Sequence, residues 1–261
     1  MLKIASWNVN SLNVRLPHVL AWTDVAQPDI LALQETKLPD DRFPVDHLLE
    51  AGYQAVYSGQ PTYNGVAILS REAAREVVTD VPGLEDPQRR ILAGTIPTDL
   101  GDTRIINLYV VNGSEVGSEK FEYKMHWLEK VTAWLESEAR QHDRLVVLGD
   151  FNIAPDDRDV HDPEAWRGKV LCSAAERSAL KRMLDIGLKD TFRQFEQEEK
   201  VFSWWDYRMN AFRRKMGLRI DLVLASESMA NSCVASYVDI EPRRQERPSD
   251  HAPAIAEFSL Q

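Results

Sequence analysis

The sequence lacks several features that define particular classes of protein. It has only two cysteines, Cys172 and Cys233, in 261 residues, which is too few for a disulfide framework, so we expect a reducing, cytoplasmic setting. No apolar run approaches the roughly 18 residues of a membrane span, so we expect no membrane contact. The N-terminal segment has one lysine, a short apolar run and no small-residue cleavage site. We therefore expect no signal peptide.

The chain also lacks an excess of positive charge. Its 31 Lys and Arg against 41 Asp and Glu give a formal net charge of −10. This balance excludes a protein that coats DNA through a general basic field, so nucleic-acid binding requires a local patch or a metal ion. No low-complexity tract or Gly/Ser-rich linker divides the chain, and its length is close to the limit for one hydrophobic core. We expect a single domain over residues 1–261 that acts as a monomer.

Short apolar runs rich in Val, Ile and Leu recur along the chain and predict β-strands, several of them buried on both faces. The predicted strands are 3–7, 29–33, 53–57, 65–69, 91–96, 104–109, 145–148, 220–225 and 254–258. Helical periodicity predicts helices at 118–140, 174–186, 16–25 and 44–51. Because strands outnumber helices, we expect a sheet-on-sheet core with helices packed outside it rather than strict βαβ alternation.

Polar residues follow or end several of the predicted strands. They are Asn8, Glu35, Tyr109, Asp150, Asp221 and the segment 248–251. Each could be a turn or cap residue, but glutamate is a poor turn former. Six such ends together predict a site on one rim of the sheets.

Two residues of this set, Asp150 and Asp221, each leave two interpretations open. If the strand before Asp150 continues, Asp150 and Asn152 share a face; the alternative is an Asx turn. Asp221 lies inside an apolar run and requires a partner, for which His251 is the candidate. Such a pair serves acid–base chemistry, although purely structural Asp–His pairs are also common.

The ligand types at the rim predict a particular kind of metal. No Cys/His cluster has zinc spacing, so we expect no zinc site. The candidates Asn8, Glu35 and Asp250, with Asp150 near them, are all oxygen donors. Such hard ligands suit Mg²⁺ or Mn²⁺, held partly by water and by a substrate phosphate.

A basic, aromatic segment at 201–219 predicts contact with nucleic acid. Residues 207–219 contain five cations and no acid, and aromatic residues are interleaved with them. The candidate DNA-binding residues there are Trp204, Arg208, Arg213, Arg214 and Lys215. The alternative is that the tryptophans are core and the cations solvated, and we expect this for at least one of Trp204 and Trp205.

These residues belong to an ordered series of motifs that resembles the bacterial exonuclease III family of the endonuclease/exonuclease/phosphatase superfamily. The series runs from about residue 2 to residue 258 without large gaps. The motifs are Trp7-Asn8-Val9-Asn10, Leu33-Gln34-Glu35-Thr36-Lys37, Gly65-Val66-Ala67, Gln88-Arg89-Arg90, Asn107-Leu108-Tyr109, Gly149-Asp150-Phe151-Asn152, Phe202-Ser203-Trp204-Trp205-Asp206-Tyr207-Arg208, Leu218-Arg219-Ile220-Asp221 and Ser249-Asp250-His251-Ala252-Pro253.

The resemblance implies a fold, a reaction and a set of roles. The fold is a four-layer α/β sandwich of the DNase I-like kind, with two face-to-face sheets between helices. The reaction is Mg²⁺-dependent hydrolysis of duplex DNA in repair, leaving a 3′-hydroxyl at abasic, nicked or 3′-recessed sites.

By position, Glu35, Asn8 and Asp250 correspond to the metal site, with Asp150, Asn152 and His251 as further candidate ligands. Tyr109, Asn152 and His251 correspond to groups around the scissile phosphate. Asp150 corresponds to the residue that orients or deprotonates the attacking water, Asp221 to the partner of His251, and Trp204 to an aromatic beside the abasic sugar. The sequence leaves two candidates for the group that takes the water proton, Asp150 and the Asp221–His251 pair.

The sequence departs from this family at two places. Relatives usually carry Pro, then Gln or Ser, then Gly after the strand that ends in Tyr109, whereas this chain has Val110-Val111-Asn112-Gly113. Asn112 keeps an amide donor for DNA there. The variable segment 157–173 brings Trp166, Arg167 and Leu171, and a bulky residue in it would narrow a pocket for an extruded abasic sugar. We therefore expect 3′-end processing. Abasic-site incision should be present or weak, depending on how far this segment narrows the pocket.

Two other functions remain as alternatives. The first is a catalytically silent nucleic-acid-binding or regulatory protein on the same fold. The complete set of acidic, amide and histidine residues argues against it. The second is a phosphatase acting on inositol phosphates or lipid head groups, which would share the metal site. The basic aromatic segment argues against this second function.

Overall fold

The computed structural model describes residues 1–259 and contains two six-stranded mixed sheets. The first sheet has the order β11-β12-β1-β2-β4-β3 and the second has the order β5-β6-β7-β8-β10-β9. The strands of the first sheet are β1 (Leu2–Asn8), β2 (Ile30–Gln34), β3 (Gln54–Ser58), β4 (Val66–Ser70), β11 (Cys233–Val238) and β12 (Ala254–Phe258). Those of the second are β5 (Arg75–Val78), β6 (Ile91–Ile96), β7 (Thr103–Tyr109), β8 (Leu145–Asp150), β9 (Lys189–Asp190) and β10 (Asp221–Ala225).

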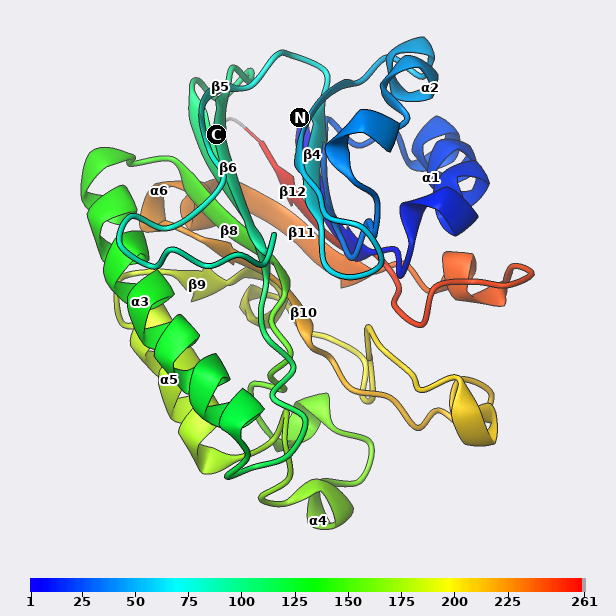
Figure 1. Cartoon of the computed structure of the whole chain (residues 1–261), viewed down its shortest axis with the longest axis vertical. Coiled ribbons are helices and arrows are strands. Elements are labelled where there is room, and N and C mark those ends of the chain that lie inside the picture. Colours follow the sequence, from blue (N-terminus) through cyan, green and yellow to red (C-terminus); the bar gives the residue numbers. More distant parts are fainter. Residues whose placement is uncertain (260–261) are drawn as a thin grey trace.

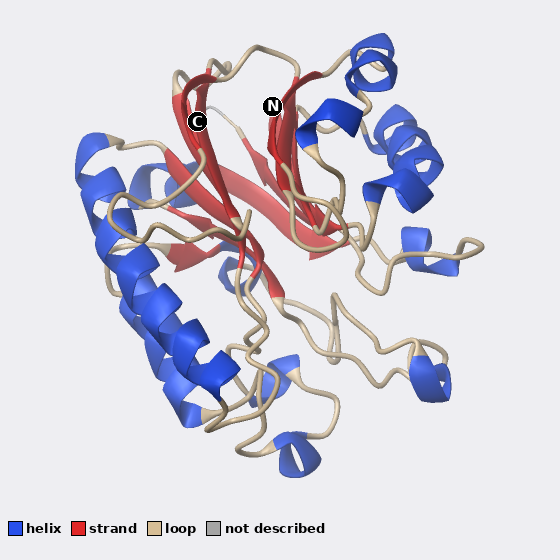
Figure 2. Cartoon of the chain, in the orientation of Figure 1, coloured by secondary structure: helices blue, strands red, loops and turns tan. Residues whose placement is uncertain are grey.

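Helices cover the outer face of each sheet, so the molecule has four layers (Figures 1 and 2). The helices α1 (Leu12–Ala26) and α2 (Val45–Glu50) lie beside the first sheet, and α3 (Glu119–Gln141) and α5 (Ala174–Leu184) lie beside the second. The short helices are α4 (Pro163–Trp166) and α6 (Glu227–Ser232). No helix within residues 1–259 is long and apolar enough to span a membrane.

Alternating side chains of the central strands explain the layers. In β8, Val146 and Leu148 point into the apolar cluster between the sheets, whereas Leu145 and Val147 pack with α3 and α5. In β1, Ile4 and Ala5 divide in the same way between the inter-sheet cluster and the cluster under α1. These strands are buried on both faces, as their continuous apolar runs predict. The predicted four-layer α/β sandwich is confirmed.

All nine predicted strands are present, and the four predicted helices form with shifted ends. The helix predicted at 16–25 begins at Leu12, because the backbone N–H groups of Ser11 and Leu12 donate to the carbonyls of Glu35 and Thr36 at 2.7 and 3.0 Å. Pro17 consequently lies inside α1 instead of near its start. The sequence interpretation missed β5, β9 and β11. β5 and β11 are edge strands with exposed residues, and β9 has two residues.

Strand pairing brings the polar strand ends to one rim. In the second sheet, Tyr109 pairs with Asp150 in the parallel β7–β8 ladder, and Asp150 pairs with Asp221 in the antiparallel β8–β10 ladder. In the first sheet, Asn8 pairs with Gln34, the residue before Glu35. The sheets are joined behind this rim by a buried hydrogen bond from Nε2 of Gln34 to Oδ1 of Asn107, 2.8 Å long. Both halves of the rim therefore face one site.

Candidate active site

The side chain of Asn8 links the two halves of the rim. Its Nδ2 donates to Oε1 of Glu35 at 3.1 Å and to Oδ2 of Asp150 at 2.9 Å. Asn8 and Asp150 are both almost completely buried. Because a carboxylate only accepts hydrogen bonds, the amide nitrogen is the group that can hold both acids at once. Two candidate residues from different sheets are thus fixed relative to each other.

Glu35 is held as an anion despite its burial. Its carboxylate accepts from the Tyr109 hydroxyl at 2.6 Å, and its second oxygen lies 2.9 Å from Nζ of Lys37. Burial opposes ionisation, but the Lys37 charge and the hydrogen bonds from Tyr109, Lys37 and Asn8 outweigh it and lower the pKa of Glu35. The backbone of Glu35 is left-handed at φ 52°, which turns the chain sharply out of β2.

Tyr109 stays protonated in this setting. Burial and the neighbouring Glu35 carboxylate both raise the pKa of its hydroxyl well above the usual value. The Arg90 guanidinium lies 4.5 Å from the centre of the Tyr109 ring, and Nη1 of Arg90 donates to the Tyr109 carbonyl at 3.2 Å. The ring is therefore fixed, and the single hydrogen of its hydroxyl is donated to Glu35.

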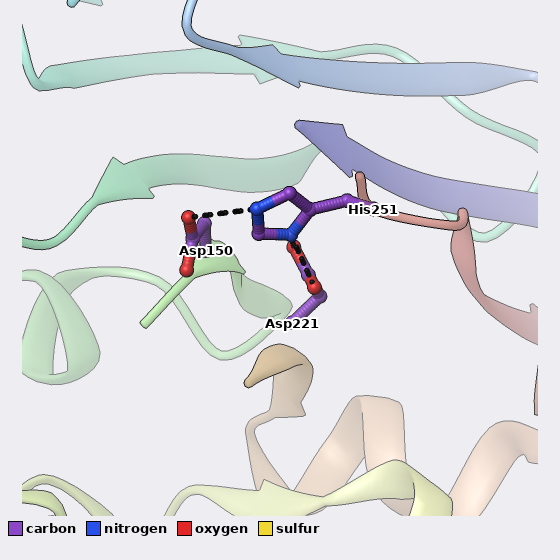
Figure 3. Close-up of side chains that lie close together, drawn as sticks. All are labelled: Asp150, Asp221 and His251. Atoms are coloured by element: carbon purple, nitrogen blue, oxygen red, sulfur yellow. Dashed lines mark hydrogen bonds and ion pairs between the residues drawn. The ribbon is translucent and has the colours of Figure 1, made fainter. Parts of the chain in front are cut away.

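His251 lies between two carboxylates (Figure 3). Its Nδ1 is 2.9 Å from Oδ2 of Asp221, and its Nε2 is 3.7 Å from Oδ2 of Asp150. Ser203 supports the arrangement by donating from Oγ to Asp221 at 2.6 Å. Burial disfavours the imidazolium, but the charges of Asp221 and then Asp150 outweigh it and raise the pKa of His251. The predicted pairing of Asp221 with His251 is present.

The Asx-turn alternative is correct for Asp150 and Asn152. β8 ends at Asp150, and the backbone N–H of Asn152 donates to Oδ1 of Asp150 at 2.9 Å. The strand does not continue, because Asn152 has a left-handed backbone with φ 47°. The side chains still meet, since Nδ2 of Asn152 lies 3.3 Å from Oδ2 of Asp150. Burial raises the pKa of Asp150, opposed mainly by His251.

Asp250 is linked to the site through Asn10. Its carboxylate accepts from Nδ2 of Asn10 at 2.9 Å and from Nε1 of Trp204 at 3.0 Å. Asn10 in turn accepts from Nζ of Lys37 at 2.6 Å. Asp250 is therefore joined to Glu35 through Asn10 and Lys37 rather than by direct contact. The sequence interpretation gave no role to Asn10 or Lys37, although both lie within the quoted motifs.

The oxygen donors at Glu35 fit a hard divalent cation. The Lys37 ammonium already lies among oxygens of Glu35 and Asn10, so this part of the site is built for positive charge. Carboxylate and amide oxygens suit Mg²⁺ or Mn²⁺. A second group, Asp150, Asp221 and His251, also has its ligand atoms within 4.8 Å of one another. In this second group, however, Nδ1 of His251 is hydrogen-bonded to Asp221 and is therefore not free to bind a metal ion.

The basic segment divides into core and surface. Trp205 is buried in an apolar cluster, and Arg219 is buried against Asp159 and Asp190. Arg208 is exposed but paired with Asp206 at 3.1 Å. By contrast, Arg213, Arg214 and Lys215 are exposed on a loop beyond the rim. Trp204 packs against the cluster that contains Leu171.

The two-sheet sandwich, with acid, amide, tyrosine and imidazole groups on one rim, defines a DNase I-like hydrolase. Residues 5–251 match the Endonuclease/Exonuclease/phosphatase family. The chain is 35% identical to exodeoxyribonuclease III of Haemophilus influenzae over 98% of this chain and all of that protein. The chain belongs to this family, within the group that contains exodeoxyribonuclease III.

Solved structures agree with this assignment. A 3′ phosphatase, NExo from Neisseria, solved with a product DNA hairpin, is 48% identical with a TM-score of 0.96, each chain covered completely. An AP endonuclease from Archaeoglobus fulgidus is 37% identical with a TM-score of 0.94, again with complete coverage of both chains. The matches support a DNA-repair nuclease and not the catalytically silent alternative.

Proposed function

We propose that this chain is a single-domain, monomeric, Mg²⁺- or Mn²⁺-dependent phosphodiesterase of duplex DNA. Its substrates are 3′ ends, either recessed or carrying blocking groups, and abasic sites. The observation that carries the proposal is the Asn8 amide, which donates to both Glu35 and Asp150, while Nε2 of His251 lies 3.7 Å from the same oxygen of Asp150. Candidate metal ligands and phosphate-handling groups thereby form one contiguous site.

The roles follow from charge and hydrogen-bonding capacity. Glu35 and Asp250 would hold the cation, which supplies charge neutralisation on the phosphate and leaving oxygen. Asn8 would join them through Oδ1, which in this structure accepts the backbone N–H of Asn10 at 3.0 Å. His251 is kept protonated by its two carboxylate neighbours, so it donates to a phosphate oxygen. Nδ2 of Asn152 donates here to the Val110 carbonyl at 2.9 Å and to Asp150 at 3.3 Å. A bond to the phosphate would replace the longer of these two and would stabilise charge that develops in the transition state.

Asp150 is the group best suited to accept a proton from the attacking water. Burial raises its pKa, and a base whose pKa lies closer to the working pH accepts a proton more effectively. His251 does not compete for this proton, since Asp221 and Asp150 favour its charged form. The Tyr109 hydroxyl, which donates to Glu35 in this structure, would turn from Glu35 to donate to the same phosphate.

The proposal is tested with three labelled substrates in Mg²⁺: an abasic duplex, a duplex with a recessed or 3′-blocked end, and an inositol phosphate. We expect cleavage at the 3′ end and incision at the abasic site, loss of both with a chelator, and restoration by added Mg²⁺. DNA binding without cleavage would instead establish the silent alternative. Phosphate release from the inositol phosphate alone would establish the phosphatase.

A further inference from the structure

Lys124 and Glu176 form a buried ion pair behind the site, and both side chains have no exposed surface. Lys124 lies on α3 and Glu176 on α5, and Nζ of Lys124 is 2.5 Å from Oε1 of Glu176. We propose that this pair is a positioning device that fixes Asn152 at the reacting phosphate and ties it to the segment around Leu171. The inference rests on the proposed function, because it assigns Asn152 a place at the phosphate.

The Lys124 ammonium uses all of its donors. Besides Glu176, it donates to the backbone carbonyl of Asn152 at 2.7 Å and to that of Asn112 at 3.1 Å. An ammonium has three N–H groups and no acceptor, so three acceptors match it fully, whereas a neutral amine would leave one unsatisfied. Lys124 therefore joins the loop after β7 to the loop after β8, and Asn112 Nδ2 also donates to Asn152 Oδ1 at 3.1 Å.

The Glu176 carboxylate is equally saturated. Its Oε1 accepts from Lys124 and from the backbone N–H of Leu171 at 2.9 Å. Its Oε2 accepts from the backbone N–H and the hydroxyl of Ser173, at 3.1 and 2.5 Å. Ser173 is the N-cap of α5, and Glu176 completes a capping box. Four bonds on one carboxylate fix the segment that leads into α5.

The pair thus contacts both parts of the site that matter for substrate. Asn152 and Leu171 each have a left-handed backbone, with φ 47° and 73°, a conformation that persists where the surroundings impose it. Leu171 packs in the apolar cluster that Trp204 covers. Because one buried pair holds the carbonyl of Asn152 and the N–H of Leu171, a shift of the pair moves the phosphate donor and the pocket wall together.

A contribution to folding stability alone does not explain why a buried ion pair stands at this position. A buried ion pair gains little over well-packed apolar residues, and removing one member leaves a costly unpaired charge. The experiment therefore changes both members. In Lys124→Met/Glu176→Gln all donors at position 124 are lost without an unpaired charge. In Lys124→Gln/Glu176→Gln an amide with two donors is kept at position 124.

A matched control is available on the same helix. Arg104 and Glu138 form a second buried ion pair, 2.7 Å apart, between the first half of β7 and the C-terminal part of α3. Arg104→Met/Glu138→Gln removes a similar pair at the end of β7 opposite Tyr109. Folded fraction, kcat and KM are measured for all variants on the 3′-recessed and abasic duplexes in saturating Mg²⁺.

We expect kcat of Lys124→Met/Glu176→Gln to fall about 10- to 100-fold with KM changed little, since small displacements of positioned groups cost this much. The ratio of 3′-end to abasic cleavage should change, Lys124→Gln/Glu176→Gln should recover part of kcat, and the Arg104 and Glu138 control should keep wild-type kcat. If the Met-containing variant does not fold, the variant with Gln at both positions is compared with the control.

Wild-type kcat in the folded variants, or an equal loss in the control, would overturn the inference. A wild-type protein without Mg²⁺-dependent cleavage of either duplex would instead overturn the proposed function. The same assay therefore separates the two failures.

Discussion

Oδ2 of Asp221 lies 2.9 Å from Nδ1 of His251, and this contact directs Nε2 of the imidazole toward Asp150. The carboxylate accepts the Nδ1–H group, which fixes the ring orientation, and its charge favours the imidazolium, as in other carboxylate-oriented histidines. Asp221→Asn removes that charge with little change of shape. We expect kcat to fall on the order of 10²-fold or more, with KM nearly unchanged.

Steady-state kinetics on the 3′-recessed duplex measure this effect. Ser203→Ala is the graded control, because it removes one hydrogen bond to Asp221 and keeps the carboxylate. A smaller loss of kcat is expected there. Wild-type kcat in Asp221→Asn would assign the Asp221–His251 pair a structural role only.

Glu35 provides the test of the metal site. Glu35→Gln keeps the size of the side chain but removes the charge that faces Lys37 and the proposed cation. Cleavage should be lost, while the melting temperature changes little, because a partly exposed ion pair contributes only about 0–1 kcal/mol. Activity is titrated against Mg²⁺ and unfolding is followed by circular dichroism. Full activity of Glu35→Gln in saturating Mg²⁺ would contradict the assignment.

The sequence predicts the rim well for a simple physical reason. A polar residue at the end of a buried strand is costly unless it has a function or a partner, and this criterion finds Asn8, Asp150 and Asp221. Glu35 follows from the same argument because glutamate rarely serves a turn. Strand register then brings these residues together, as the pairing of Tyr109 with Asp150 and of Asp150 with Asp221 shows.

Residues that act through tertiary contacts escape such reasoning. Lys124 reads as a solvated charge on an amphipathic helix, and only the fold places it between Glu176 and two loop carbonyls. Arg219 reads as part of a basic patch but is buried between two aspartates. The turn at Asn152 depends on one backbone dihedral, which two polar residues spaced by one do not specify.

The exposed cations on the loop beyond the rim should control DNA binding. Neutralising Arg213, Arg214 and Lys215 together should weaken duplex binding and reduce the salt slope by up to about three units, because each phosphate contact releases close to one counterion. Affinity is measured at several salt concentrations without cleavage. An unchanged slope would place these cations in solvent.

A control with the same change of net charge separates local contacts from bulk charge. Arg140, Lys181 and Arg182 are exposed on α3 and α5, which cover the outer face of the second sheet. Their combined neutralisation should leave the slope near that of the wild type. Equal losses in both triple variants would favour a general electrostatic effect.

Both cysteine thiols should be unreactive in the folded protein. Burial raises the pKa of Cys172 and of Cys233 from 9.0 to about 11. The thiolate is the nucleophile, so below pH 9 its fraction is about 100-fold smaller than for an ordinary thiol. Modification by a disulfide reagent at pH 8 should therefore be slow and should accelerate with rising pH. Rapid reaction of either cysteine at pH 8 in the folded protein, as in the denatured control, would contradict this prediction.

Leu171 tests which wall limits the entry of an abasic nucleotide. A 3′ terminus enters by fraying at low cost, whereas an internal abasic nucleotide must be extruded into a pocket of fixed volume. Leu171 is buried in the cluster covered by Trp204, and its φ of 73° is one that glycine adopts without strain.

Leu171→Gly should raise abasic incision with little change in the 3′-exonuclease rate. The proposed metal and phosphate groups would serve both reactions, so a change in the site itself would alter both rates. Leu180→Ala, in the separate cluster under α5, controls for lost packing and should leave the ratio of the two rates unchanged. If Leu171→Gly alters both rates equally, or neither, the limiting wall lies elsewhere.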